Sequence, residues 1–124
     1  MRLLLDTHVV LWWRTDSRKL GRAVRRAIGT ADLVFVSAAS GWEIAIKQSL
    51  GKLRLTGSFA EMVKASDFTE LPVTLRHAEQ LARLPPHHAD PFDRMLVAQA
   101  QVEGVKLVTH DRQMESYGVS IVWV

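Results

Sequence analysis

Short, mostly apolar runs alternate along the chain with segments whose apolar residues recur at helical spacing. Continuous apolar runs of this length are typical of strands that are buried on both faces of a sheet. The runs that we interpret as strands are residues 3–5, 33–36, 106–109 and 119–124. A weaker strand is expected over residues 70–73, and Pro72 favours a position at the edge of the sheet because proline cannot donate to a ladder.

Helical patterns fill the intervals between these strands. The expected helices are residues 8–13, 20–28, 40–50, 75–84 and 91–103, with a further helix start at Ser58. Ser40 and Glu43 have the spacing of a capping box. Pro91 suits a first helical position, and Gly104 is a plausible stop after the last helix. This alternation of strands and helices predicts an α/β sandwich around a mainly parallel sheet.

Composition narrows the class of protein. The chain has 124 residues, of which 48% are apolar, so we expect a single globular domain over residues 1–124. The absence of cysteine excludes disulfides, thiolate zinc sites and a cysteine nucleophile. No apolar run is long enough to span a membrane, and the first residues do not form a signal peptide. We therefore expect a cytoplasmic protein without membrane contact.

Four acidic residues fall where a parallel α/β sheet would place them at one edge. They are Asp6, Glu43, Asp93 and Asp111. Two of them follow expected strands, and the other two lie near the starts of expected helices. In such sheets, functional sites form beyond the carboxyl ends of the strands. The pattern therefore predicts that the four carboxylates converge.

Each acid also has a purely structural explanation. Asp6 and Asp111 can cap the turns that follow them, and Glu43 completes the capping box. Asp90 is a natural N-cap before Pro91, and Asp93 then lies where the helix dipole favours an anion. Capping does not explain why all of these acids share one edge.

Converging carboxylates repel one another and need a cation between them. An oxygen-lined site of this kind suits Mg²⁺ or Mn²⁺, which activate water and neutralise phosphate charge. We therefore expect a metal site that hydrolyses phosphodiesters, with Asp6 and Asp93 as the main ligands. Glu43 and Asp111 would complete the site or orient water.

The remaining polar and aromatic residues are less informative. His88 and His110 flank the acids and are interpreted either as ordinary polar contacts or as substrate contacts. The net charge of +3 permits nucleic-acid binding without establishing it. Basic clusters at residues 14–19, 22–26 and 47–54 are interpreted as solvated faces, or as RNA contacts if the acids form a nuclease site. The four tryptophans are expected in the core or at an interface, with base stacking as the weaker alternative.

Several segments together resemble a known family. They are residues 4–8 (LLDTH), 37–47 (SAASGWEIAIK), 51–53 (GKL), 88–100 (HADPFDRMLVAQA) and 107–111 (LVTHD). They make the chain similar to PIN-domain ribonucleases, specifically the toxins of VapBC-type toxin–antitoxin modules. The family more often has a small residue at the position of His110.

The resemblance implies a three-layer α/β/α sandwich and a metal-dependent endoribonuclease that cleaves tRNA or rRNA. It implies that Asp6, Glu43, Asp93 and Asp111 bind Mg²⁺ or Mn²⁺, with Asp90 assisting. It also implies a homodimer and a VapB-like antitoxin partner. Two alternatives stay open: an RNA-processing PIN nuclease without a toxin role, and a non-catalytic RNA-binding or protein-binding domain whose acids only cap helices.

Overall fold

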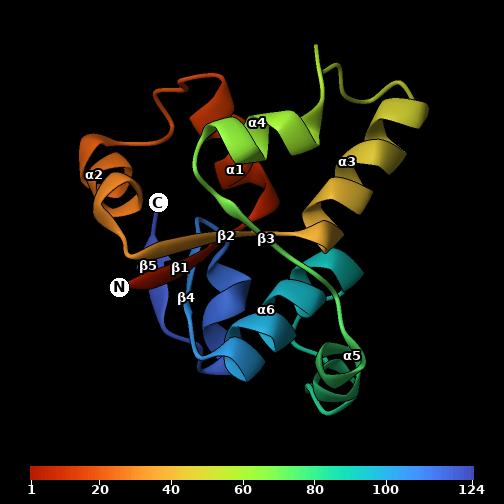
Figure 1. The fold of residues 1–124 in the computed structure, drawn as a ribbon. Helices are drawn as coiled ribbons and strands as arrows, with labels where there is room; N and C mark the ends of the chain where they lie inside the picture. Colours follow the sequence, from red (N-terminus) through yellow and green to blue (C-terminus); the bar gives the residue numbers. More distant parts are fainter.

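Five strands form one parallel sheet with helices on both of its faces, in a computed structural model that describes residues 1–124 (Figure 1). The strands are β1 (Arg2–Leu5), β2 (Leu33–Ser37), β3 (Thr69–Leu71), β4 (Lys106–Thr109) and β5 (Ile121–Trp123). The helices are α1 (Thr7–Arg14), α2 (Arg22–Thr30), α3 (Ala38–Ser49), α4 (Phe59–Ala65), α5 (Leu75–Ala82), α6 (Pro91–Glu103) and the 3₁₀ helix η1 (Arg112–Tyr117). The predicted three-layer α/β/α sandwich is confirmed.

The strand order β3-β2-β1-β4-β5 puts the first strand at the centre of the sheet. Leu4 of β1 pairs with Phe35 of β2 on one side and with Leu107 of β4 on the other. Because every pair is parallel, the carboxyl ends of all five strands lie at the same edge. The weak strand at β3 forms one border of the sheet, as Pro72 predicts.

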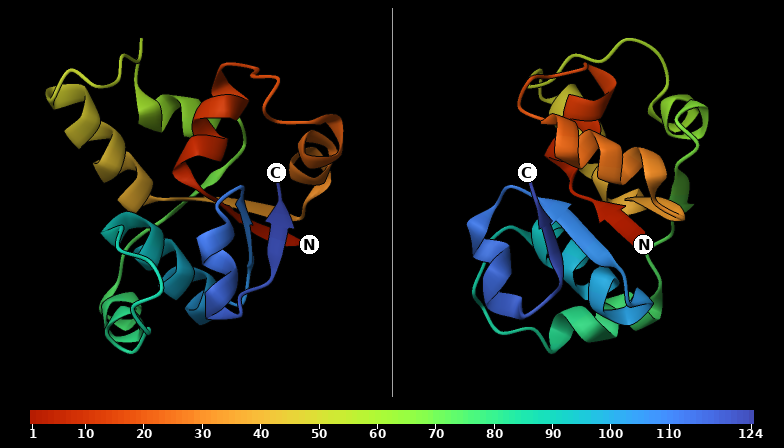
Figure 2. Two further views of the ribbon diagram at one scale, coloured as in Figure 1. Left: turned by 180° about the vertical axis from the view of Figure 1, so that it is seen from behind. Right: turned by 90° about the vertical axis from the view of Figure 1, so that its left-hand side faces the viewer.

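Two hydrophobic clusters cover the two faces of the sheet. One joins Leu3 and Leu5 to residues of α1, α2 and α4, and the other joins Leu4 to residues of α6 and η1. Alternate residues of β1 thus enter opposite layers, as the two-residue repeat of a strand requires. Figure 2 shows the same two helical layers from behind and from the side. Complete burial of Leu3, Leu4 and Leu5 explains why this part of β1 is continuously apolar.

Several local predictions were wrong in detail. Helix α3 begins at Ala38 with Ser37 as its N-cap, so Ser40 and Glu43 lie inside the helix and form no capping box. Helix α2 continues through Gly29 to Thr30. The last strand is shorter than residues 119–124. In α3, the Ser37 side chain already accepts from the backbone N–H of Ala39, so the helix starts three residues earlier than the Ser-x-x-Glu pattern indicates.

No helix of the structure combines the length and the apolar composition that a membrane crossing requires.

Candidate functional site

Asp6 is fixed at the end of the central strand. It follows β1, is only 2% exposed, and serves as the N-cap of α1. Its Oδ1 accepts the backbone N–H of His8 at 2.7 Å, and its Oδ2 accepts the hydroxyl of Thr109 at 2.6 Å. Both carboxylate oxygens therefore have a donor that sets their position. The capping prediction for this residue is confirmed, and capping does not exhaust its lone pairs.

Asp90 and Asp93 stand together at the start of α6. Oδ1 of Asp90 accepts the N–H groups of Phe92 and Asp93 at 2.8 and 3.1 Å, so Asp90 is the N-cap. Burial, and after it the negative charges of Asp90, Asp6 and Glu43, raise the pKa of Asp93 to about 7 against the opposing effect of His88. The acids are therefore close enough to disfavour a charge on Asp93.

Glu43 reaches the site from the second turn of α3 and is only 7% exposed. Its Oε2 accepts from Nζ of Lys47 at 2.9 Å, one helical turn away. Its Oε1 is buried without any hydrogen-bond partner. A buried carboxylate oxygen in this state is costly, which makes it a suitable ligand atom for a cation.

Asp111 is joined to Asp93 by a histidine. Nε2 of His88 lies 2.7 Å from Oδ2 of Asp111 and 3.2 Å from Oδ2 of Asp93. Nδ1 of His88 accepts the backbone N–H of Asp90 at 3.1 Å, so Nε2 must carry the proton of the neutral ring. Partial burial acts to raise the pKa of Asp111. Hydrogen bonds from His88 and from the Gln113 N–H nevertheless hold this pKa below its usual value.

Two threonine hydroxyls organise the same edge. Thr109, at the end of β4, donates to Asp6 and accepts the backbone N–H of Asp111 at 3.0 Å. Thr7, directly after Asp6, donates to the hydroxyl of Ser40 at 2.8 Å and so ties α1 to α3. These buried bonds join elements that follow different strands, and they fix the relative positions of the acids.

We call Asp6, Glu43, Asp90, Asp93 and Asp111 the carboxylate cluster. The four acids that the sequence predicted at one edge, together with Asp90, meet around Asp93 or are joined to it through His88. The cluster offers only carboxylate oxygens plus imidazole nitrogens at its border. This donor set, with the orphaned Oε1 of Glu43, fits a hard divalent cation.

The border histidine His88 was the residue that sequence reasoning undervalued. It was interpreted as either an ordinary polar contact or a substrate contact, yet it bridges two acids that are 18 positions apart in the chain, Asp93 and Asp111. The short distance between His88 and Asp90 in the sequence is the only signal that could have suggested its role.

The basic residues do not all remain free for a ligand. The guanidinium of Arg25 binds the carbonyls of Leu20 and Ser17 and pairs with Asp16, so it closes the loop before α2. Lys47 is already paired with Glu43. The expected RNA contacts therefore cannot include Arg25 without opening that loop.

The tryptophans occupy four different settings. Trp13 packs on Phe68, and Trp12 packs on the rings of His8 and His110. Trp123 lies beneath the guanidinium of Arg112 at 4.2 Å. In contrast to a core residue, Trp42 is 65% exposed and contacts Phe92.

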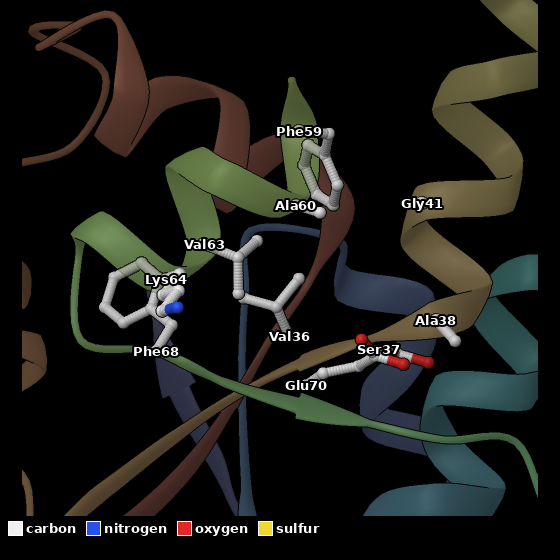
Figure 3. Close-up of a pocket in the computed structure, with 10 residues that line it drawn as sticks. All are labelled: Val36, Ser37, Ala38, Gly41, Phe59, Ala60, Val63, Lys64, Phe68 and Glu70. Atoms are coloured by element: carbon white, nitrogen blue, oxygen red, sulfur yellow. The ribbon is translucent and has the colours of Figure 1, made fainter.

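A pocket of about 460 Å³ opens between α3 and α4 over strands β2 and β3 (Figure 3). Phe59 and Val63 of α4 form one wall, Ala38 and Gly41 of α3 line the opposite side, and Val36 lies between them. Lys64 and Glu70 give the pocket one charge of each sign. The pocket shares α3 with the carboxylate cluster, because Gly41 lines the pocket and Glu43 belongs to the cluster.

Sequence comparison gives one family and one close relative. The family model described as "PIN domain" matches residues 3–119. Ribonuclease VapC22 of Mycobacterium tuberculosis is 34% identical over 93% of this chain and 91% of the relative. The matched region includes every member of the carboxylate cluster.

Structural comparison finds the same fold in toxin–antitoxin complexes. VapBC2 from Rickettsia felis, bound to a promoter DNA fragment, matches with a TM-score of 0.75 and 11% identity over 98% of each chain. DNA-bound VapBC from Salmonella typhimurium matches with a TM-score of 0.68 and 17% identity, over 98% of this chain and 97% of the other. At these identities the likeness establishes the fold alone.

Proposed function

Because the chain belongs to the PIN-domain family, we propose that it is a Mg²⁺- or Mn²⁺-dependent endoribonuclease and the toxin of a VapBC-type module. The observation that carries the proposal is the convergence of carboxylates on the partly buried Asp93: burial, and after it the negative charges of Asp90, Asp6 and Glu43, raise its pKa to about 7. Helix capping requires no such crowding. A site for a divalent cation, in contrast, is built from carboxylates that lie close together.

The residues of the cluster have separate roles in this proposal. Asp6 and Asp93 would hold the cation, and Glu43, whose buried Oε1 has no hydrogen-bond partner, would add a ligand atom. Mg²⁺ or Mn²⁺ bound there supplies positive charge against the phosphate and makes water more acidic. Asp111 orients the attacking water, and the N–H of His88 fixes the Asp111 carboxylate at 2.7 Å. Asp90 keeps its capping role and adds negative charge.

The substrate is a single-stranded or looped segment of RNA, with tRNA and rRNA as the expected sources. The relative with 34% identity is named a ribonuclease, which supports RNA over other phosphodiesters. The purified chain should cleave RNA with Mg²⁺ or Mn²⁺ and stop when a chelator is added. If Asp6→Asn and Asp93→Asn both leave cleavage intact, the proposed site is wrong.

The partner is a VapB-like antitoxin, as the structural relatives in toxin–antitoxin complexes suggest. The pocket between α3 and α4 is lined mainly by apolar residues, which suits an apolar segment of such a partner. Expression of the chain alone should arrest growth, and co-expression of a small upstream gene should relieve the arrest. Growth arrest by the Asp93→Asn variant would contradict the toxin role of the nuclease.

The chain is proposed to form one PIN domain that assembles as a homodimer. The exposed ring of Trp42 lies beside Phe92 at an apolar pocket of about 400 Å³, which also includes Val73 and Met95. A second copy could bury this surface. Trp42→Asp should convert the dimer into a monomer in sedimentation equilibrium, and a monomeric unmodified chain would refute the assignment.

A further inference from the structure

Three aromatic rings contact one another beside the carboxylate cluster, with interplanar angles of 35° for His8 and Trp12, 55° for Trp12 and His110, and 89° for His8 and His110. The ring centroids of His8 and Trp12 are 5.9 Å apart, one helical turn along α1. His110, which follows β4, lies 5.5 Å from His8 and 4.9 Å from Trp12. Each ring therefore contacts both of the others. We call this group the aromatic trio.

One ring of the trio packs against the protein interior, and the other two rings are exposed to solvent. Trp12 is half-buried and packs against the hydrophobic cluster of α1, α2 and α4. His8 and His110 are exposed, and the side chain of His8 retains 52% of its accessible surface. Neither imidazole makes a hydrogen bond, although His8 Nδ1 lies 3.9 Å from Asp6 Oδ1. Hydrogen bonding thus gives no reason for two exposed histidines at this place.

The trio also borders the proposed reaction centre, because Nδ1 of His8 lies 3.9 Å from Oδ1 of Asp6. The backbone N–H of His8 donates to Asp6, and His110 stands between Thr109 and Asp111, which both belong to the site's hydrogen-bond network. A phosphate held at Asp6 would carry its neighbouring base across these rings. The ammonium of Lys19, 5.6 Å from the centroid of the Trp12 ring, adds positive charge beside the trio.

From this arrangement we infer that the aromatic trio binds the nucleobase next to the scissile phosphate by stacking. Aromatic and imidazole rings stack on unpaired bases of any sequence, and proteins that bind single strands use them repeatedly. The inference rests on the proposed ribonuclease function and extends it to the contact that orients the RNA strand.

The test compares two labelled RNA probes on the full chain. One probe is a fluorescein-labelled oligoadenylate of six nucleotides, and the other is the same ribose-phosphate chain without bases. Fluorescence anisotropy is measured in the Asp93→Asn background with chelator, so that neither probe is cut. The ratio of the two dissociation constants isolates the contribution of the bases from that of the phosphates.

Four variants are compared in that background. His8→Ala and His110→Ala each remove one exposed ring, and His110→Phe keeps a ring while it removes the nitrogens. His87→Ala is the matched control, because His87 is also an exposed imidazole on an aromatic ring, that of Tyr117, outside the trio. A thermal melt of each variant checks that the fold is retained.

Stacking predicts that His8→Ala and His110→Ala reduce the preference for the base-containing probe by roughly fivefold or more. His110→Phe and His87→Ala should leave the preference within about twofold of the parent. The inference is overturned if both alanine variants keep the full preference. It is also overturned if His110→Phe fails as severely as His110→Ala, since the nitrogens and not the ring would then matter, as in a metal ligand.

Failure of the inference and failure of the proposed function are separable. Cleavage by the unmodified chain in Mg²⁺ without any base preference in binding would refute the trio and keep the nuclease. Base-dependent binding that the alanine variants abolish, in a chain that never cleaves RNA, would keep the trio and refute the nuclease.

Discussion

Thr109 donates a hydrogen bond of 2.6 Å to Oδ2 of Asp6, although the two residues are 103 positions apart. The bond joins the ends of β4 and β1, which are neighbours in the sheet. The same threonine oxygen accepts the backbone N–H of Asp111. One buried hydroxyl therefore sets the position of two acids of the carboxylate cluster.

Replacement of Thr109 by valine should test this relationship. Valine has nearly the same shape, but it leaves the buried Oδ2 of Asp6 and the N–H of Asp111 without their partner. We expect the free energy of unfolding to fall by about 1–3 kcal/mol in a urea titration. Thr109→Ser restores the hydroxyl and should recover most of the loss; equal destabilisation by serine would mean that the methyl group matters instead.

The stability of the metal-free protein should depend on pH through Asp93. Its pKa is about 7 in the folded chain and near 3.8 when unfolded, so the folded state binds an extra proton between these values. The free energy of unfolding should therefore fall as pH rises from about 4 to 7. The loss should amount to roughly 2 kcal/mol after allowance for solvent screening.

Thermal unfolding at pH 5 and at pH 8, in the presence of a chelator, measures this loss of stability. Asp93→Asn carries no titrating group and should be the more stable protein at pH 8, with a flatter pH profile than the parent. Glu79→Gln, which changes an exposed acid of α5, should leave the profile unaltered. A parent profile as flat as that of Asp93→Asn would refute the raised pKa.

Addition of Mg²⁺ should raise the melting temperature, because a cation relieves the repulsion within the cluster only in the folded state. The increase should be larger at pH 8 than at pH 6, since a proton on Asp93 competes with the metal. Isothermal titration calorimetry checks binding independently of activity. Binding that is as strong in Asp6→Asn and Asp93→Asn as in the parent would place the metal elsewhere.

Asp90 combines a cap with a charge, and two substitutions separate them. Asp90→Ser can still accept the N–H groups at the start of α6, whereas Asp90→Ala cannot and should cost about 1 kcal/mol. Both variants remove a negative charge that raises the pKa of Asp93, so this pKa should fall in each. NMR titration of the Asp93 carboxyl measures the shift, and an unchanged pKa in both would show that Asp90 does not act on it.

Loss of His88 should disconnect Asp111 from Asp93. In His88→Ala the pKa of Asp111 should rise toward its ordinary value because the donated hydrogen bond is absent. RNA cleavage should fall by about 10- to 100-fold, as is usual when a residue that orients a metal site is removed. His87→Ala, one position away, is the control and should cleave normally; an equal loss there would point to the loop as a whole.

Local sequence patterns were sufficient for much of the fold. Strands at residues 3–5, 33–36 and 106–109 are visible as apolar runs because each is buried between two layers, and Pro72 correctly placed β3 at an edge. Asp90 and Pro91 correctly predicted the start of α6. Where two start signals competed, as at Ser37 and Ser40, the sequence did not identify the residue that caps α3.

The sequence by itself determined which residues are acidic and that they follow strands or begin helices. Only the tertiary structure decided that Asp6 meets Thr109, that His88 joins Asp93 to Asp111, and that Oε1 of Glu43 has no partner. The physical reason is that hydrophobic periodicity reports on a few neighbouring residues at a time. The order of strands β3-β2-β1-β4-β5, which brings these side chains together, arises from packing over the whole chain.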